Sequence, residues 1–101
     1  MAAISTAITD RSDADITNVS STEVAAQNLG RQYLLIQNVS DVVLYVRFGA
    51  AASATLADAA GSFQLAVGAS LIFEGESFVP SSSVNIIAAS GTGKDVVVWE
   101  A

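Results

Sequence analysis

The sequence predicts an all-β fold: an antiparallel β-sandwich or barrel, jelly-roll-like, with about seven or eight short strands. Three observations support this prediction. Runs of apolar and β-branched residues recur roughly every ten residues, the spacing of strands in all-β domains. Gly, Ser, Asn and Asp gather between these runs, where turns are expected. No window repeats its apolar residues with a helical period, so crossover helices are not expected.

The chain has 101 residues, of which 51% are hydrophobic, and this is enough for one domain with one core. We expect a single sandwich or barrel domain over residues 14–101, preceded by a flexible arm over residues 1–13. The arm is small and polar, and Thr6 and Thr9 disfavour a helix in it. Because such arms often order against a neighbouring subunit, Ile4 and Ile8 are candidate interface residues.

A β pattern begins at Ala14 and reaches a turn at Gln27–Gly30. The strongest strand prediction follows, at Arg31–Asn38. Its segment Tyr33–Ile36 is continuously apolar, which is typical of a strand that is covered on both faces.

A polar turn at Asn38–Asp41 leads into the next strand, Val42–Phe48, and the two strands are predicted to pair as a hairpin. Alternate residues of Val42–Phe48 give one apolar face and one mixed face, and the mixed face carries Tyr45 and Arg47. Tyr45 and Trp99 lie one residue out of phase with the apolar faces. They either anchor an interface, where Tyr and Trp are enriched, or belong to a sheet whose two faces are both covered. Arg47 is a candidate interface residue beside Tyr45.

An Ala-rich loop is expected at Gly49–Gly61, with a helical tendency between Ala57 and Ala60. Two more hairpins are predicted after it, and Pro80 is expected in a turn between them. The predicted pairs are Ser62–Ala66 with Ser70–Glu74, in which Phe63 and Leu65 face Leu71 and Phe73, and Val84–Ala89 with Asp95–Glu100.

Charged residues make up 14% of the chain, against about 25% in ordinary soluble domains. Four basic and ten acidic residues give a net charge of −6. This balance argues against nucleic acid and anionic membranes as partners, because both are bound through clustered Lys and Arg. The surface is either covered by Ser, Thr and Asn or buried by partner proteins. One Lys and one Pro leave strand edges unprotected, so either a barrel closes the sheet or neighbouring subunits cover the edges.

No catalytic, cofactor-binding or metal-binding residues are expected, so the chain is predicted not to be an enzyme. His and Cys are absent, which removes the usual general base and thiol nucleophile. The segment Ser90–Asp95 resembles part of a phosphate-binding loop, but Ala88 stands where that loop needs Gly, and Asp95 stands where it needs Ser or Thr.

Two groups of acidic residues have the composition of a cation site or a catalytic pair, but neither is predicted to be one. Asp13 and Asp15, with Asp10 nearby, are too few oxygen ligands for a shaped cation loop and are expected to be solvated. Glu74 and Glu76 flank Gly75 in an expected turn, so they are interpreted as ordinary surface acids rather than a glycosidase pair. The first residues lack the basic and apolar regions of a secretory leader, and no apolar run is long enough to span a membrane.

Residues 22–101 carry an ordered series of β segments. A strand R-x-Y-L-L-I-Q-N, a polar turn, a strand ending in Phe-Gly, an Ala-rich loop, a Gly-centred hairpin with Phe-Glu, a Val-Pro pair and a final hairpin with G-T-G-K follow one another. This order resembles that of small virion proteins of tailed bacteriophages. The matching pieces are Arg31–Asn38, Val42–Gly49, Gly49–Gly61, Leu65–Gly75, Val79–Pro80 and Val84–Glu100.

The resemblance implies a non-enzymatic virion structural protein, made in the bacterial cytoplasm and located on the capsid exterior. The implied role is a capsid decoration or cement protein that binds copies of itself, as a symmetric homo-oligomer such as a trimer, and the major capsid protein. A tail, neck or head-fibre component is the alternative within the same class. A carbohydrate-binding β-sandwich that aids host attachment is the alternative from another class, with Trp99 or Tyr45 as the stacking residue.

Overall fold

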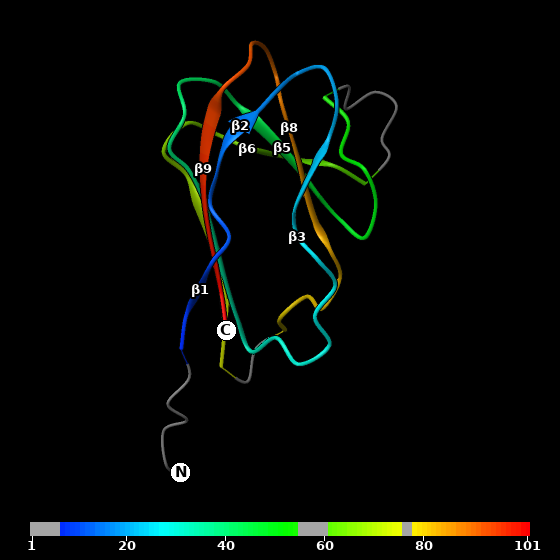
Figure 1. The fold of residues 1–101 in the computed structure, drawn as a ribbon, viewed down its shortest axis with the longest axis vertical. Coiled ribbons are helices and arrows are strands. Elements are labelled where there is room, and N and C mark those ends of the chain that lie inside the picture. The colour runs from blue at the N-terminus through cyan, green and yellow to red at the C-terminus, as the bar shows by residue number, and fades with distance from the viewer. Residues whose placement is uncertain (1–6, 55–60, 76–77) are drawn as a thin grey trace.

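The computed structural model describes residues 7–54, 61–75 and 78–101, and these residues form nine strands in two antiparallel sheets (Figure 1). Sheet A contains β1 (Thr9–Asp10), β2 (Asp13–Ile16), β4 (Tyr33–Asn38), β7 (Ser70–Glu74) and β9 (Lys94–Glu100). Sheet B contains β3 (Thr22–Ala25), β5 (Leu44–Phe48), β6 (Phe63–Leu65) and β8 (Val84–Ala88). Among the described residues there is no helix that could cross a membrane.

The strand order confirms the predicted fold class as a β-sandwich. Sheet A has the order β1-β9-β4-β7, with β2 also pairing with β9, and sheet B has the order β3-β8-β5-β6. From β2 onward, consecutive strands lie in opposite sheets, except β5 and β6, which pair with each other. When β1 and β2 are taken as two parts of one edge, this is the eight-strand order of a jelly roll.

The core lies between the two sheets and consists of the side chains that point inward from alternate positions of the strands. Leu34 and Ile36 of β4 and Leu44 and Val46 of β5 are fully buried, as the alternating pattern of β5 predicts. Each such side chain stabilises the fold by about 1.5–3 kcal/mol relative to an exposed one. The other buried apolar residues of this core are Ile16, Val24, Ala25, Leu65, Val84, Ile86, Ala88, Val96 and Val98.

The three predicted hairpins are wrong as strand pairings. In each case the two strands are joined by a turn, but they belong to opposite sheets: β4 and β5, β6 and β7, and β8 and β9. Phe63 and Leu65 therefore lie on the opposite inner face of the sandwich from Leu71 and Phe73. A polar, Gly-containing turn reverses the chain equally well within one sheet or between two, so its sequence does not fix the hydrogen-bonding partner.

The sheet begins inside the range that the sequence assigned to the arm. Thr9 and Asp10 pair with Glu100 and Trp99, and the Arg11 N–H donates to the Val98 carbonyl over 2.6 Å. Residues 9–13 thus lie along β9, whereas residues 1–6 are outside the described part of the chain. The difference arises because the partner of this segment is about ninety positions away, and local composition carries no signal of such pairing.

Candidate interaction surface

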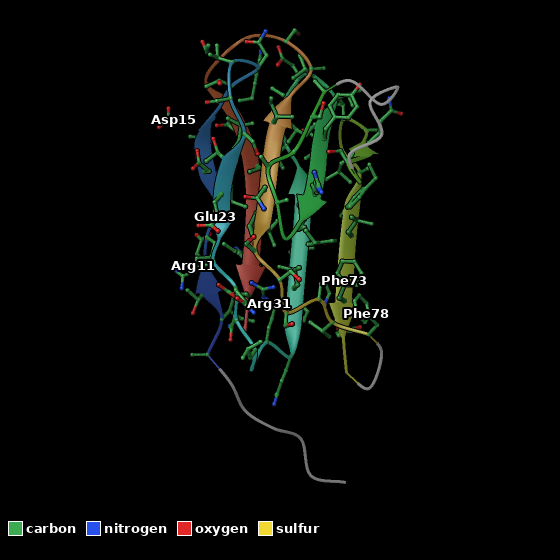
Figure 2. The ribbon with its side chains drawn as sticks, turned by 90° about the vertical axis from the view of Figure 1, so that its right-hand side faces the viewer. Arg11, Asp15, Glu23, Arg31, Phe73 and Phe78 are labelled. Atoms are coloured by element: carbon green, nitrogen blue, oxygen red, sulfur yellow. The ribbon has the colours of Figure 1, made fainter. Side chains whose placement is uncertain are left out.

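The outer face of sheet B is covered by the chain itself. Figure 2 looks onto this face and shows the segment after β5 passing in front of the strands. Ala52 in that segment is 7% exposed, and its N–H donates to the Ser21 hydroxyl over 2.9 Å. Ile87 points outward from β8 and is only 9% exposed. The predicted helical tendency at 57–60 lies outside the described residues.

The outer face of sheet A is left open by the described residues. Leu35 of β4 pairs with Trp99 of β9 on one side and with Ile72 of β7 on the other, so the three side chains form a row across the sheet. This apolar row (Trp99, Leu35 and Ile72) includes two of the chain's exposed large apolar side chains: Trp99 is 41% exposed and Ile72 is 55% exposed. Tyr33 and Val97 lie half-buried in the rows on either side.

The prediction that β4 is covered on both faces is therefore wrong for this chain alone. Leu34 and Ile36 point into the core, whereas Tyr33 and Leu35 point to the open outer face. The sequence has the composition of a doubly covered strand, but the described chain supplies one cover. A protein of this composition is expected to gain the second cover from another molecule.

Three carboxylates surround the apolar row on the same face of sheet A. Asp10 pairs with Trp99, Glu74 pairs with Tyr33, and Asp95 points outward by its place in β9; all three are exposed. We call them the acidic rim. Hydrogen bonds from the side chain and backbone of Ser12 lower the pKa of Asp10, so this carboxylate is ionised at neutral pH.

None of the four basic residues belongs to the rows of this face, but two lie at its margin: the Arg11 side chain is 51% exposed next to Asp10, and Lys94 precedes Asp95. Arg31 and Arg11 bind Glu100, each over 2.9 Å, and Lys94 binds Asp41 over 2.8 Å. The fourth, Arg47, lies on the outer face of sheet B, where it donates to a carbonyl of the covering segment over 3.4 Å. The outer face of sheet A is thus apolar at its centre and mainly acidic at its rim, where the neighbouring Arg11 and Lys94 are each paired with a carboxylate.

A buried polar cluster lies where the end of β9 meets the loops before β4 and after β7. The Glu100 carboxylate accepts hydrogen bonds from Asn28, Arg31 and Arg11 over 2.9–3.1 Å. Burial alone would raise the pKa of Glu100, but these hydrogen bonds together hold the pKa below its ordinary value. Arg31 completes its bonding with the carbonyls of Ala26, Pro80 and Ser82. Because every group in the cluster is satisfied, its role is to join elements rather than to bind a ligand.

A shallow, open hollow lies between the β4–β5 turn and the β8–β9 turn. It measures about 410 Å³ and is lined by Val39, Ser40, Asp41, Gly93, Lys94 and Asp95. The segment Ser90–Lys94 forms the turn between β8 and β9, so it does not lead into a helix that could cradle a phosphate. The one ammonium group of the hollow is already bound by Asp41.

The acidic pairs weighed in the sequence do not form a cation site within the described residues. No group of three or more Asp and Glu side chains lies close enough there to hold a metal ion. Asp13 instead accepts the backbone N–H of Asp15 over 2.7 Å. Glu74 is the last residue of β7, as the predicted strand Ser70–Glu74 has it, and Glu76 lies outside the described residues.

An aromatic cluster closes the lower edge of the sandwich where β7 passes β6. Phe48 contacts Phe63 and Phe73 at ring-centroid distances of 5.8 and 5.9 Å. Phe78 lies against Phe73 at 6.4 Å and is 75% exposed (Figure 2). This edge therefore extends the apolar surface beyond the core, on the side where β7 has no further strand partner.

The structure does not bring the predicted interface residues together. Trp99 lies on the open face of sheet A, whereas Tyr45 and Arg47 lie half-buried on the opposite outer face, on sheet B. Ile8 precedes β1 and is 50% exposed, and Ile4 lies outside the described residues.

Leu35 and Ile72 were missed as interface residues. Ile72 could have been found by the rule that singled out Trp99, since it is one residue out of phase with Leu71 and Phe73. Comparison with known proteins identifies no relative: no family model, curated protein or solved structure matches the chain significantly. A function for the chain therefore rests on its own surface.

Proposed function

We propose that the chain is a non-enzymatic virion structural protein of a tailed bacteriophage, a capsid decoration or cement protein on the outer head surface. The observation that carries the proposal is the contrast between the two outer faces. Sheet B is covered by the chain's own segment, whereas the apolar row of sheet A is open. An open apolar face of this kind is removed from water by binding another protein. The resemblance of residues 22–101 to small phage virion proteins suggests that the other protein belongs to a phage particle.

A cement protein of this kind acts by mass action. It binds the assembled shell and not the separated capsomers, so its binding free energy adds to the stability of the shell. Weak contacts that are repeated by the symmetry of the shell give strong attachment without a single strong site. The sandwich itself needs no chemistry for this role, only a rigid face.

Contacts between copies of the chain are proposed to use the strand edges. The two sheets are open rather than closed into a barrel, so β7 has one hydrogen-bonded neighbour, β4. The β7 sequence Ser-Leu-Ile-Phe-Glu contains neither Lys nor Pro, the usual guards of a free edge. Neighbouring copies that cover this edge would form the symmetric homo-oligomer, such as a trimer, that the resemblance implies.

Quantitative mass spectrometry of purified virions tests the proposal. A head decoration protein is expected in copy numbers on the order of hundreds, since it follows the symmetry of the shell. Particles lacking the chain should lose infectivity sooner under heat or osmotic shock. Absence from virions, or unchanged resistance of the deletion particles, contradicts the cement role. A copy number of about six to twelve would place the chain in the neck or tail instead.

A second candidate function is carbohydrate binding during host attachment. The observation that favours it is the pairing of the exposed Trp99 ring with the Asp10 carboxylate on one face. An aromatic ring stacks on the apolar face of a sugar, and a carboxylate accepts hydrogen bonds from the hydroxyl groups of the sugar. A glycan array probed with the native chain and with Trp99→Ala tests this candidate. An array without hits removes it.

A further inference from the structure

We infer that the outer face of sheet A docks a different protein, whose contact surface is apolar at its centre and carries Lys and Arg at its rim. A second copy of this chain is not the occupant of that face. The inference rests on the proposed assembly role and adds the chemistry of the partner. It is argued from the apolar row, the acidic rim and the placement of every basic residue.

The centre of the face has the composition of an interface core. Leu35 lies between Trp99 and Ile72 in direct register, so the apolar row is continuous across three strands. Trp is the residue type that most often dominates binding energy at interfaces, and here it is 41% exposed beside the half-exposed Ile72. The partner must therefore present apolar side chains to this row.

The rim sets the charge of the partner. Asp10 lies beside Trp99, Glu74 lies at the β7 edge, and Asp95 lies toward the start of β9, so the carboxylates stand on different sides of the row. The two basic residues next to this rim, Arg11 and Lys94, are already paired with Glu100 and Asp41, and the other two lie elsewhere. A basic rim on the partner would complement these carboxylates, whereas an acidic rim would be repelled.

The same charges exclude a second copy. Two copies packed face to face through sheet A would bring two acidic rims together, and the nearby Arg11 and Lys94 are already paired with carboxylates of their own chain. Juxtaposed like charges oppose association by several kcal/mol. Self-association of the chain is therefore expected through other surfaces, of which the β7 edge and the exposed Phe78 are described above.

The outer face of sheet A is too small to form a stable interface through its apolar row alone. Strand spacing and rise give the outer face of sheet A roughly 300 Å². A stable protein interface buries about 800 Å² on each partner. The partner must therefore reach past the apolar row and over the acidic rim, and a single contact is expected to be weak and salt-sensitive.

The experiment uses Trp99 as the reporter, since it is the only Trp of the chain. The probe is a synthetic β-hairpin peptide with Leu and Val on one face and Lys around that face; the control peptide carries Glu in place of Lys. The Lys peptide is expected to shift Trp99 emission to shorter wavelength and to bind more weakly in 0.5 M salt. The Glu peptide should leave the emission unchanged. Equal shifts with both peptides, or none with either, would overturn the inference.

Substitutions in the acidic rim distinguish the contribution of its charges to peptide binding from that of the apolar row. The triple change Asp10→Asn, Glu74→Gln and Asp95→Asn keeps the apolar row and should weaken binding of the Lys peptide by about tenfold. Glu23→Gln is the matched control for Glu74→Gln, because Glu23 is an exposed acid in the middle of a sheet B strand. Unchanged affinity of the triple variant, with its thermal melt like that of the native chain, would overturn the inference.

Two further measurements distinguish this inference from the proposed function. A dimer that dissociates on Trp99→Ser, a change on the open face and away from the β7 edge, would make a second copy the occupant and overturn the inference; analytical ultracentrifugation measures this. If virions bind the triple variant as tightly as the native chain, the inference fails while the structural role stands. If the Lys peptide binds but the chain is absent from virions, the structural role fails while the chemistry of the face stands.

Discussion

Arg31 and Glu100 are 69 positions apart in the sequence, yet the Arg31 Nε donates to the Glu100 carboxylate over 2.9 Å. Both side chains are buried, at 0% and 5% exposure. Through its remaining donors, Arg31 also holds the carbonyls of Pro80 and Ser82. This pair therefore joins the end of β9 to the loop before β4 and the loop after β7, at the lower end of the sandwich in Figure 1.

Replacement of Arg31 by Met is expected to destabilise the fold by about 3–5 kcal/mol, because it leaves the buried Glu100 carboxylate without its main partner. Arg31→Lys should be nearly as harmful, since an ammonium group cannot reproduce the planar fork of the guanidinium. Urea unfolding gives the free energy of each variant. Arg47→Met is the matched control, because the Arg47 side chain donates one hydrogen bond, of 3.4 Å, to the described residues. Equal losses for Arg31→Met and Arg47→Met would refute the assignment.

Stability is expected to fall as the pH drops below about 4.5, the ordinary pKa of a Glu carboxyl. The folded-state pKa of Glu100 is lowered, so its stabilising effect is fully present above the unfolded pKa and is lost as the pH falls through the folded value. The lowered pKa of Asp41, caused by its hydrogen bond from Lys94, acts in the same direction.

Urea midpoints between pH 3 and pH 7 measure this dependence. Glu100→Gln should be less stable than the native chain at neutral pH but should lose less stability on acidification. Glu23→Gln is the control and should keep the native slope, because Glu23 lies on the surface of β3. A slope for Glu100→Gln as steep as the native one would count against a role for the Glu100 carboxylate.

Asn38 is fully buried at the end of β4 and joins three segments of the chain. Its side-chain amide donates to the carbonyls of Val42 and Leu65 over 2.8 Å, and its side-chain oxygen accepts from Ser40. Asn38→Ala removes the buried bond to the Leu65 carbonyl, whereas the Val42 carbonyl keeps its bond from the Ser40 hydroxyl, and the change is expected to cost about 1–3 kcal/mol. Thermal unfolding measures the loss. Asn18→Ala, at an exposed loop position, should change the midpoint little.

One of the hydrogen bonds that hold the covering segment on sheet B can be removed by a single substitution. Ser21→Ala deletes the hydroxyl that accepts the Ala52 N–H, at a cost of about 1 kcal/mol. Hydrogen exchange should speed up at Ala52 and should stay slow in the core strands. Ser20→Ala, one residue away and exposed, is the matched control. Unchanged exchange at Ala52 in the Ser21 variant would show that the segment is held by other contacts.

The local features of the fold could be predicted from the sequence. Alternation correctly placed Leu44 and Val46 in the core and Tyr45 on the opposite face, because the period of a strand is a local property. Pro80 was correctly placed outside any strand. Strand pairing could not be predicted in this way. Tyr33 pairs with Glu74 and Thr9 pairs with Glu100, and the partners in such pairs are set by the whole core rather than by the turns between strands.

The candidate surface was predicted only in part. Trp99 was identified because it is out of phase with its apolar neighbours, and it does lie on an open face. Leu35 was missed because it stands inside the continuous run Tyr33–Ile36, which hides the alternation. Leu35 lies beside Ile72 because of the register between β4 and β7, two strands that are distant in the sequence. The same register places Glu74 of the acidic rim beside Tyr33. Neither is visible before the pairing is known.

The position of β9 has a consequence for how the chain is made. This strand is synthesised after every other described strand, yet it lies between β4 and the β1–β2 edge in the middle of sheet A. During translation, β1, β2 and β4 are therefore synthesised before the strand with which they all pair. Until β9 is added, the sheet A side of the core, which includes Leu34 and Ile36, is incomplete. Folding is expected to finish only after β9 has left the ribosome and to be slow, since the pairings of β9 with β1, β2 and β4 join segments far apart in the sequence.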